Sequence, residues 1–136
     1  MAIKVVEGIW ISRVLVENPE NVIPHIGDKV QLVRASCWQE VAFAAVLAKR
    51  AFERRTNHAK TLGGELLLRL SGGLQIKDAI KERGVKKGEN YLVVFGDKAA
   101  LEKFIKEHGL KEVETTSCSP AEMKTFFDKS ALVEVL

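Results

Sequence analysis

The residues with the clearest chemical potential are basic ones gathered between positions 49 and 87. This segment holds eleven of the chain's 21 Lys and Arg residues and four acids, a net +7 against +3 for the whole chain. The eleven are Lys49, Arg50, Arg54, Arg55, Lys60, Arg69, Lys77, Lys81, Arg83, Lys86 and Lys87. Each cation that meets a phosphate releases condensed counterions, so such a one-sided field favours RNA or DNA as partner. The alternative is a well-solvated helical face.

Groups suited to catalysis or metal binding are sparse. His25, His58 and His108 stand alone in the sequence. The Ser-Gly-Gly run at 71–73 could point backbone amides at an anion, but a glycine turn between helices is the alternative, since neither GxxxxGK[ST] nor GxGxxG is present. We therefore expect a binding subunit and not an enzyme, without metal, cofactor or small-molecule substrate. A triad assembled only in space would escape this reasoning.

The two cysteines, Cys37 and Cys118, lie far apart and lack CxxC spacing. This pattern suggests neither a zinc site nor a disulfide framework, and we predict two buried, small apolar residues. No stretch approaches the roughly 20 apolar residues of a membrane span, and the N-terminus lacks a signal-peptide core. We expect a cytoplasmic protein without membrane contact. Scarce Met and Cys beside plentiful Lys and Glu suggest a heat-loving source.

Length and composition fit one domain over residues 1–136, since 46% of residues are hydrophobic and 29% charged. Apolar patterns predict strands over 3–6, 9–16, 30–33, 91–95, 110–114 and 131–136. They predict helices over 36–55, 61–70, 74–83 and 97–108, with a last helix from 119. This order predicts an α/β (α+β) fold with one mixed, mostly antiparallel sheet flanked by helices.

Capping residues mark several helix ends. Ser36 with Gln39, and Ser119 with Glu122, have the spacing of capping boxes. Asp97 is the expected N-cap of helix 97–108. The helix over 36–55 is apolar on nearly all sides, which predicts burial in the monomer or, alternatively, against another protein.

Two neighbouring segments carry more specific expectations. The 61–70 segment fits both a helical face and strand alternation, and a start at Thr61 with Glu65 in the first turn favours helix. In helix 74–83 we expect Ile76, Ala79 and Ile80 to face inward. Gly84 is the expected left-handed stop of that helix.

An ordered set of short motifs runs through this region and beyond. Its members are Ala42 to Ala51, Asn57 and Ala59, Glu65 to Leu68, Ser71 and Gly72, Gln75 and Ile76, Ala79 and Ile80, Gly84, and the ending Ala131 to Glu134. From about Val30 onward the chain resembles the small-subunit family of the KEOPS complex (TPRKB-like, archaeal type). Gly63 and Gly64 depart from the family pattern, in which bulkier residues are usual, and this argues against a helix there.

The resemblance implies a non-catalytic role in making threonylcarbamoyladenosine on tRNA. Its implied partners are the kinase-like ATPase subunit of the complex and, for archaeal members, the single-stranded 3′ CCA end of tRNA. The charge pattern agrees, because single-stranded RNA needs cations for phosphates and apolar or planar groups for unstacked bases.

On this basis we assign candidate RNA-binding residues. We expect phosphate contacts from Arg54, Arg55, His58, Lys60 and Arg69, and a terminal-nucleotide pocket shaped by Ser71, Gly72, Gln75 and Ile76. For Gln75 and Ile76 the alternative is structural, a turn amide and a core side chain. The account requires the cations to converge into one stripe. Two other functions stay open: a pure protein-docking subunit using helix 36–55 or the C-terminal elements, and a small-molecule enzyme with an unrecognised site.

Overall fold

The computed structural model describes the backbone of residues 2–135 and the side chains of residues 2–128. One sheet contains β1 (Ile3–Val6), β2 (Ile9–Val16), β3 (Val30–Val33), β4 (Gly88–Val94) and β5 (Lys111–Val113). The strand order is β1-β2-β4-β3, and β5 pairs with β2 beyond the end of β1. Every described pairing is antiparallel. The predicted fold class is therefore confirmed.

Both faces of the sheet are covered. On β2, Ile9 and Ile11 point to one core, whereas Val14 and Val16 point to the other. The alternation of β2 looks imperfect in sequence because its apolar side changes halfway along the strand. The central strand β4 is buried on both faces, as its continuous apolar run predicts.

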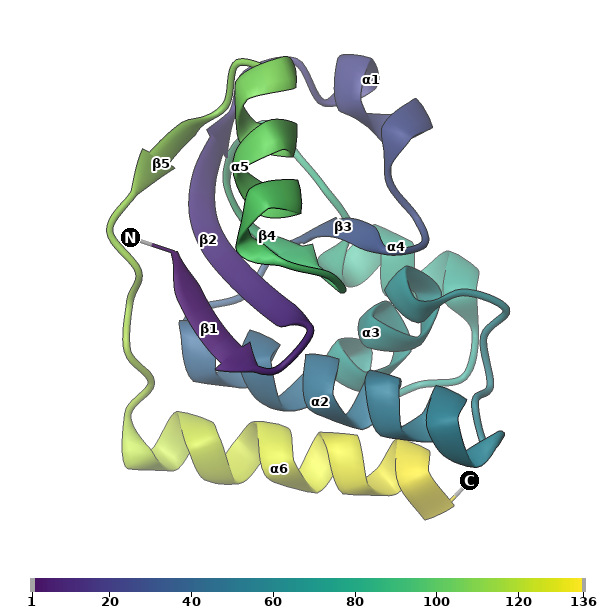
Figure 1. Ribbon diagram of the computed structural model, residues 1–136. Coiled ribbons are helices and arrows are strands. Elements are labelled where there is room, and N and C mark those ends of the chain that lie inside the picture. The colour runs from purple at the N-terminus through teal and green to yellow at the C-terminus, as the bar shows by residue number, and fades with distance from the viewer. Residues whose placement is uncertain (1, 136) are drawn as a thin grey trace.

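The helices form unequal layers on the two faces (Figure 1). α2 (Trp38–Arg54) and α3 (Leu62–Ser71) cover one face, α4 (Ile76–Arg83) packs against α3, and α6 (Pro120–Val135) lies outside α2. The other face carries α5 (Lys98–Glu107), α1 (Pro19–Val22) and a 3-10 turn, η1 (Ile23–His25). Among the described residues, no helix combines the length and apolar character needed to cross a membrane.

The helix over 61–70 is confirmed in spite of its two glycines. Thr61 is the N-cap, and its hydroxyl accepts a hydrogen bond from the Gly64 amide at 3.0 Å. Gly63 allows a close approach: a Cβ there would lie 2.8 Å from the carbonyl oxygen of Gly27. Gly63 therefore brings the start of α3 against the loop before β3.

The caps before α5 and α6 are also confirmed. Asp97 accepts from the Ala100 amide at 2.8 Å. Ser119 and Glu122 exchange both bonds of a capping box, at 3.0 and 3.1 Å.

The predicted capping box before α2 is wrong. Cys37 is the N-cap, no side chain caps the helix, and α2 begins at Trp38. The Gln39 side chain instead accepts a hydrogen bond from the Cys118 amide at 2.8 Å. Gln39, which the local spacing assigned to the capping box, therefore makes a long-range hydrogen bond instead.

Two expectations for α4 are also wrong. Gly84 has φ −70° and is extended, whereas Gly72, which ends the preceding helix α3, is left-handed with φ 77°. Ala79 is buried, but Ile76 and Ile80 are 40% and 53% exposed. The inward face of this short helix is narrow because, among the described elements, α3 is the one that packs most closely against it.

The predicted strand over 131–136 is wrong for its described part, because α6 continues to Val135; residue 136 lies outside the described residues. A short apolar run fits either state by pattern alone. No Gly or Pro follows Pro120 to end the helix.

The apolar helix α2 is buried within the chain, as one of the two interpretations predicted. Ala44, Ala45 and Ala48 belong to the core under the sheet. On its outer side, Phe43 contacts Phe126 and Phe127 of α6, with ring centroids 5.8 and 4.3 Å apart. The described part of α6 thus covers the outer apolar side of α2, which a partner protein would have to contact if α2 were a docking surface.

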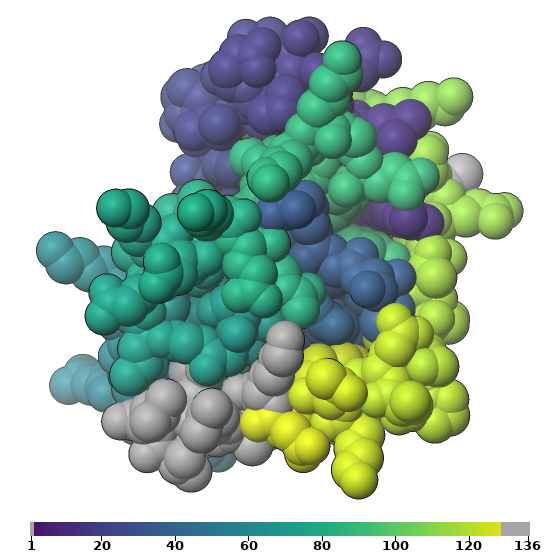
Figure 2. Space-filling model, turned by 180° about the vertical axis from the view of Figure 1, so that it is seen from behind, coloured from purple at the N-terminus to yellow at the C-terminus, as the bar shows by residue number. Residues whose placement is uncertain are grey.

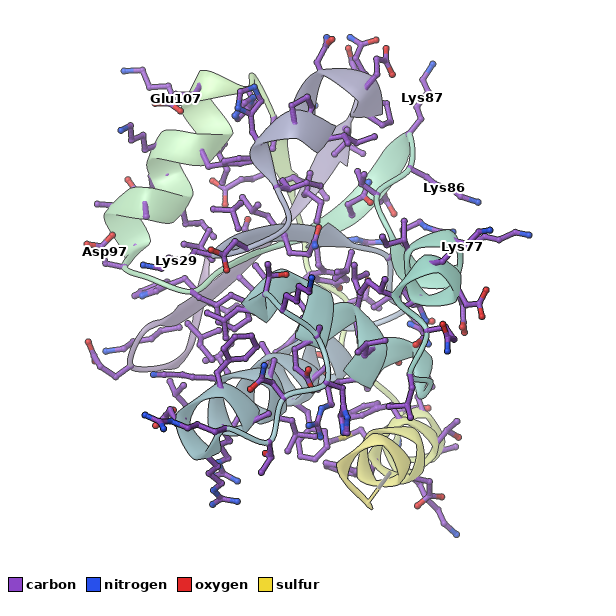
Figure 3. The ribbon with its side chains drawn as sticks, turned by 90° about the vertical axis from the view of Figure 1, so that its right-hand side faces the viewer. Lys29, Lys77, Lys86, Lys87, Asp97 and Glu107 are labelled. Atoms are coloured by element: carbon purple, nitrogen blue, oxygen red, sulfur yellow. A yellow bond between two sulfur atoms is a disulfide. The ribbon has the colours of Figure 1, made fainter. Side chains whose placement is uncertain are left out.

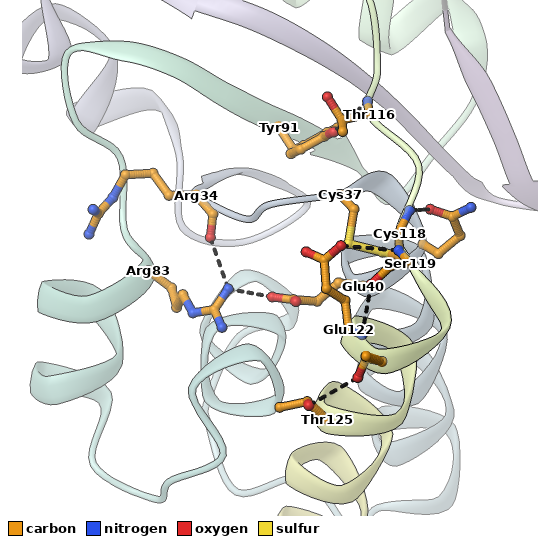
Figure 4. Close-up of a disulfide and its surroundings, with 12 residues drawn as sticks. Arg34, Cys37, Glu40, Arg83, Tyr91, Thr116, Cys118, Ser119, Glu122 and Thr125 are labelled. Carbon is orange, nitrogen blue, oxygen red and sulfur yellow. Dashed lines mark hydrogen bonds and ion pairs between the residues drawn. A yellow bond between two sulfur atoms is a disulfide. The ribbon is translucent and has the colours of Figure 1, made fainter.

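The cysteines correct a further prediction, because Cys37 and Cys118 form a disulfide (Figure 4). Cys37 is buried as expected, whereas Cys118 is half-buried, and the bond joins the starts of α2 and α6 across 81 residues of sequence. The Trp38 amide also donates to the Thr116 carbonyl at 2.8 Å. Sequence spacing gave no sign of this pairing because folding alone brings the two helix starts together. Disulfides are rare in the cytosol of mesophiles but frequent in hyperthermophiles.

Candidate nucleic-acid interface

A groove of about 490 Å³ lies where the loop after α2 meets α3 and the start of α4. Its lining residues are His58, Ala59, Lys60, Thr61, Gly64, Leu68, Leu74, Gln75 and Ile76. Figure 2 shows the surface of α4 in teal-green, with the described part of α6 in yellow beside it. The volume lies within the range of about 300–1,000 Å³ typical of small-ligand sites.

The groove combines the two kinds of surface that a nucleotide needs. Lys60 and His58 are exposed at one wall, and Gln75 and Ile76 are exposed at the other. Leu68 lies at the base of the groove and is buried. Such a site can offer a cation to a phosphate and an apolar side chain to a base, so four of the nine predicted site residues meet here.

Arg54 and Arg55 lead into this groove from the end of α2. Arg55 closes the helix in the left-handed conformation, with φ 58°. Both side chains are exposed. They stand at the start of the loop that carries His58 and Lys60, although they do not line the groove itself.

Arg69 is placed differently from the prediction. Its side chain is 1% exposed, and its Nε lies 3.0 Å from Glu65 Oε2. A guanidinium enclosed in this way does not reach a phosphate at the surface. The expected phosphate contact of Arg69 is therefore replaced by a structural ion pair, because its position on α3 points it inward.

Ser71 and Gly72 form the end of α3 and do not line the groove. The Ser71 hydroxyl donates to the Leu68 carbonyl at 3.1 Å and accepts from the Gly73 amide at 3.3 Å. The amides here serve the helix terminus, so an anion nest is not formed by them. Their effect on the groove is indirect, since they set the turn that places Gln75.

The basic segment does not converge into the single stripe that the sequence argument required. Like Arg69, two further cations of the segment are engaged within the protein. Lys49 donates to the Glu7 carbonyl at 2.7 Å, and Arg83 pairs with Glu40. Figure 3 shows Lys77, Lys86 and Lys87 along another edge of the molecule. On α4 the lysines alternate with acids, Asp78 and Glu82. The set of candidate phosphate-binding residues is therefore reduced to the cations around the groove.

A second hollow, of about 220 Å³, is mainly apolar. It lies between η1, α3 and the end of α4. Its rim carries Ile23 and Ile80, which are 52% and 53% exposed, and Leu67 lies beneath them. Exposed isoleucines around a hollow are typical of a surface that receives a protein side chain.

The histidine pair is a feature that sequence reasoning missed. His25, at the end of η1, and His108, just after α5, come together with ring centroids 4.9 Å apart. The described residues contain no cluster of three or more His, Cys, Asp or Glu side chains able to hold a metal ion.

Sequence reasoning also missed the role of Glu65. It is fully buried, and its Oε1 accepts hydrogen bonds from the amides of His58 and Ala59 at 2.7 and 2.8 Å. The available signal was a glutamate four residues before an arginine in an otherwise apolar helix, which is the spacing of an ion pair.

Two comparisons with known proteins agree with one another. Residues 29–135 match the model of a family described as kinase binding protein CGI-121. The chain is also 43% identical, over 123 residues, to a protein of Pyrococcus abyssi (strain GE5 / Orsay) named KEOPS complex subunit Cgi121. That alignment covers 88% of this chain and 72% of the relative.

Proposed function

The chain belongs to the CGI-121 family of kinase binding proteins, and from this premise we propose that it is a non-catalytic subunit of a KEOPS complex. In this role it binds the kinase-like ATPase subunit and recruits tRNA through its single-stranded 3′ CCA end. The complex as a whole makes threonylcarbamoyladenosine on tRNA, and this chain supplies contacts to that reaction without taking part in its chemistry.

The groove between the loop after α2 and the start of α4 is the observation that carries the tRNA part of the proposal. It places Lys60 and His58 opposite Gln75 and Ile76, so one wall suits phosphate and the other suits an unstacked base. A single-stranded end fits this arrangement better than a duplex, because a base reaches an apolar wall only when it is unstacked.

The kinase part of the proposal is carried by family membership. The exposed isoleucines of the second hollow, Ile23 and Ile80, support it, because a stable protein partner needs apolar surface to bury. This arrangement is also what a subunit with two partners requires, since the apolar hollow and the groove have different lining residues.

Two binding measurements test the proposal. The chain is co-expressed with the kinase-like subunit of its source organism, and co-purification is expected. The purified chain is then titrated with tRNA that carries its terminal CCA and with the same tRNA lacking it. We expect markedly tighter binding of the CCA-ended tRNA; equal binding of both would leave a protein-docking subunit as the function.

A further inference from the structure

We propose that Glu65 and Arg69 form a positioning pair that holds the RNA-facing loop in its binding conformation. Neither side chain touches the RNA in this account, which rests on the proposed function. Glu65 acts on the loop through two backbone amides, and Arg69 acts on Glu65. The pair thus determines the fraction of protein molecules in which Lys60 and His58 are positioned to contact a nucleotide.

The hydrogen bonds of Glu65 divide between the loop and α3. Oε1 accepts from the amides of His58 and Ala59, whereas Oε2 accepts from Arg69 Nε at 3.0 Å. The two side chains are 0% and 1% exposed. A buried carboxylate is tolerated only where its charge is met by such partners. The loop amides are therefore part of what keeps this ion pair inside the fold.

The same helix also builds the base of the groove. Gly64 and Leu68, on either side of Glu65 along α3, line it. A Cβ at Gly64 would lie 3.4 Å from Ile76 Cδ1, so the far wall approaches closely at this point. One helix, α3, therefore carries both the residue that anchors the loop and the residues at the base of the groove. For this reason it fixes the position of the wall that bears Lys60 relative to the wall that bears Ile76.

The consequence for binding is a population effect. If the loop holds its binding conformation only part of the time, the apparent dissociation constant rises by the inverse of that fraction. Loss of the Glu65 acceptor leaves the His58 and Ala59 amides without the bonds observed here. A loop competent for about one tenth of the time would bind about tenfold more weakly.

The informative variant removes both charges together. In Glu65→Met/Arg69→Met the pair is replaced by apolar side chains of similar length, a change that buried ion pairs often tolerate. The matched control is Glu40→Met/Arg83→Met, which removes the ion pair between α2 and the end of α4 (Figure 4). Neither Glu40 nor Arg83 lines the groove.

Three readouts separate positioning from direct contact. For the Glu65 and Arg69 variant we expect faster hydrogen exchange at the His58 and Ala59 amides and about tenfold weaker binding of CCA-ended tRNA. The slope of log affinity against log salt should stay unchanged, because no phosphate contact is lost. The control should keep wild-type affinity and wild-type exchange at both amides. A smaller salt slope, or wild-type exchange at both amides, would overturn the positioning role.

Comparing the wild type with the double variant distinguishes a failure of the positioning role from a failure of the RNA-binding function. If the wild-type protein does not distinguish CCA-ended tRNA, the RNA role fails for the whole protein. If it does distinguish it, and the folded double variant binds equally well, only the positioning role fails. Should the double variant not fold, the wild-type protein decides: slow hydrogen exchange at the His58 and Ala59 amides supports the positioning role, and exchange as fast as in an unstructured peptide overturns it.

Discussion

Lys60 and Arg69 belong to the same basic segment but differ in environment. The Lys60 side chain is exposed at the groove, whereas the Arg69 guanidinium is enclosed beside the Glu65 carboxylate. The same substitution should therefore have different consequences at the two positions, on RNA binding in one case and on folding in the other.

At Lys60, substitution by glutamate should weaken tRNA binding and leave the fold intact. Because one phosphate contact is lost, the salt dependence of binding should fall by about one in its slope. Titration of CCA-ended tRNA at several salt concentrations measures both effects. Lys103→Glu is the matched control, since Lys103 is exposed on α5 and lies outside the groove. Equal losses in both variants would point to net charge and not to the groove.

At Arg69, substitution by glutamate should destabilise the protein, because it places a second carboxylate beside buried Glu65. Breaking a buried ion pair costs about 3–5 kcal/mol. Urea unfolding followed by circular dichroism measures this loss. A stable, folded Arg69→Glu protein whose tRNA binding has a smaller salt slope would instead restore Arg69 as a direct contact.

Residue types were easier to predict than residue environments. The charge pattern, together with the family resemblance, pointed to Lys60, Gln75 and Ile76, which meet in the groove. It did not distinguish the buried Arg69 from its exposed neighbours, because a cation four residues after a glutamate fits a surface pair and a buried pair equally well. Only the packing of α3 against α2 and the sheet decides between them.

At the scale of elements, local capping signals predicted the starts of α3, α5 and α6. They failed where a distant segment takes the residue in question, as Cys118 does with Gln39. The 131–135 segment failed for another reason, since its short apolar run has no period long enough to separate strand from helix. Helix α3 was predicted from Thr61 and Glu65, whereas the need for its glycines emerged only from the packing.

The close approach at Gly63 gives a prediction for α3. A Cβ at Gly63 would meet backbone atoms of Gly27 at 2.8 Å, so Gly63→Ala should destabilise the protein by about 1–3 kcal/mol. Gly73→Ala is the control, because the nearest atom to its added Cβ would be 3.9 Å away. Thermal unfolding of both variants measures the difference. Equal melting temperatures would show that the loop before β3 moves to accommodate the added Cβ without a loss of stability.

The disulfide gives a prediction for α2 and α6. Loop-closure entropy for a crosslink across 81 residues corresponds to about 4.5 kcal/mol, an upper value for its contribution to stability. A dithiol reductant should therefore lower the denaturation midpoint of the wild type by a large margin. The Cys37→Ala/Cys118→Ala variant should unfold at a low midpoint with and without reductant. A wild type indifferent to reductant would contradict a stabilising role for this bond.

At the scale of the whole molecule, the sheet and its two helical layers determine where the charges end up. The basic segment runs from α2 to the start of β4, and its cations therefore spread over more than one side of the protein. Sequence distance could not reveal this, because direction changes at residues 55–61 and 72–75 separate neighbours in the chain. The proposal consequently depends on one groove and not on the total charge.

The most direct test of the central claim is a crosslink from the 3′ end of tRNA itself. A photoreactive nucleotide replaces the terminal adenosine, and mass spectrometry identifies the crosslinked peptide. The account predicts attachment within residues 58–61 or 74–76, the two walls of the groove, and loss of the crosslink when unlabelled CCA-ended tRNA competes. Attachment to α5, or to the edge bearing Lys86 and Lys87, would contradict it.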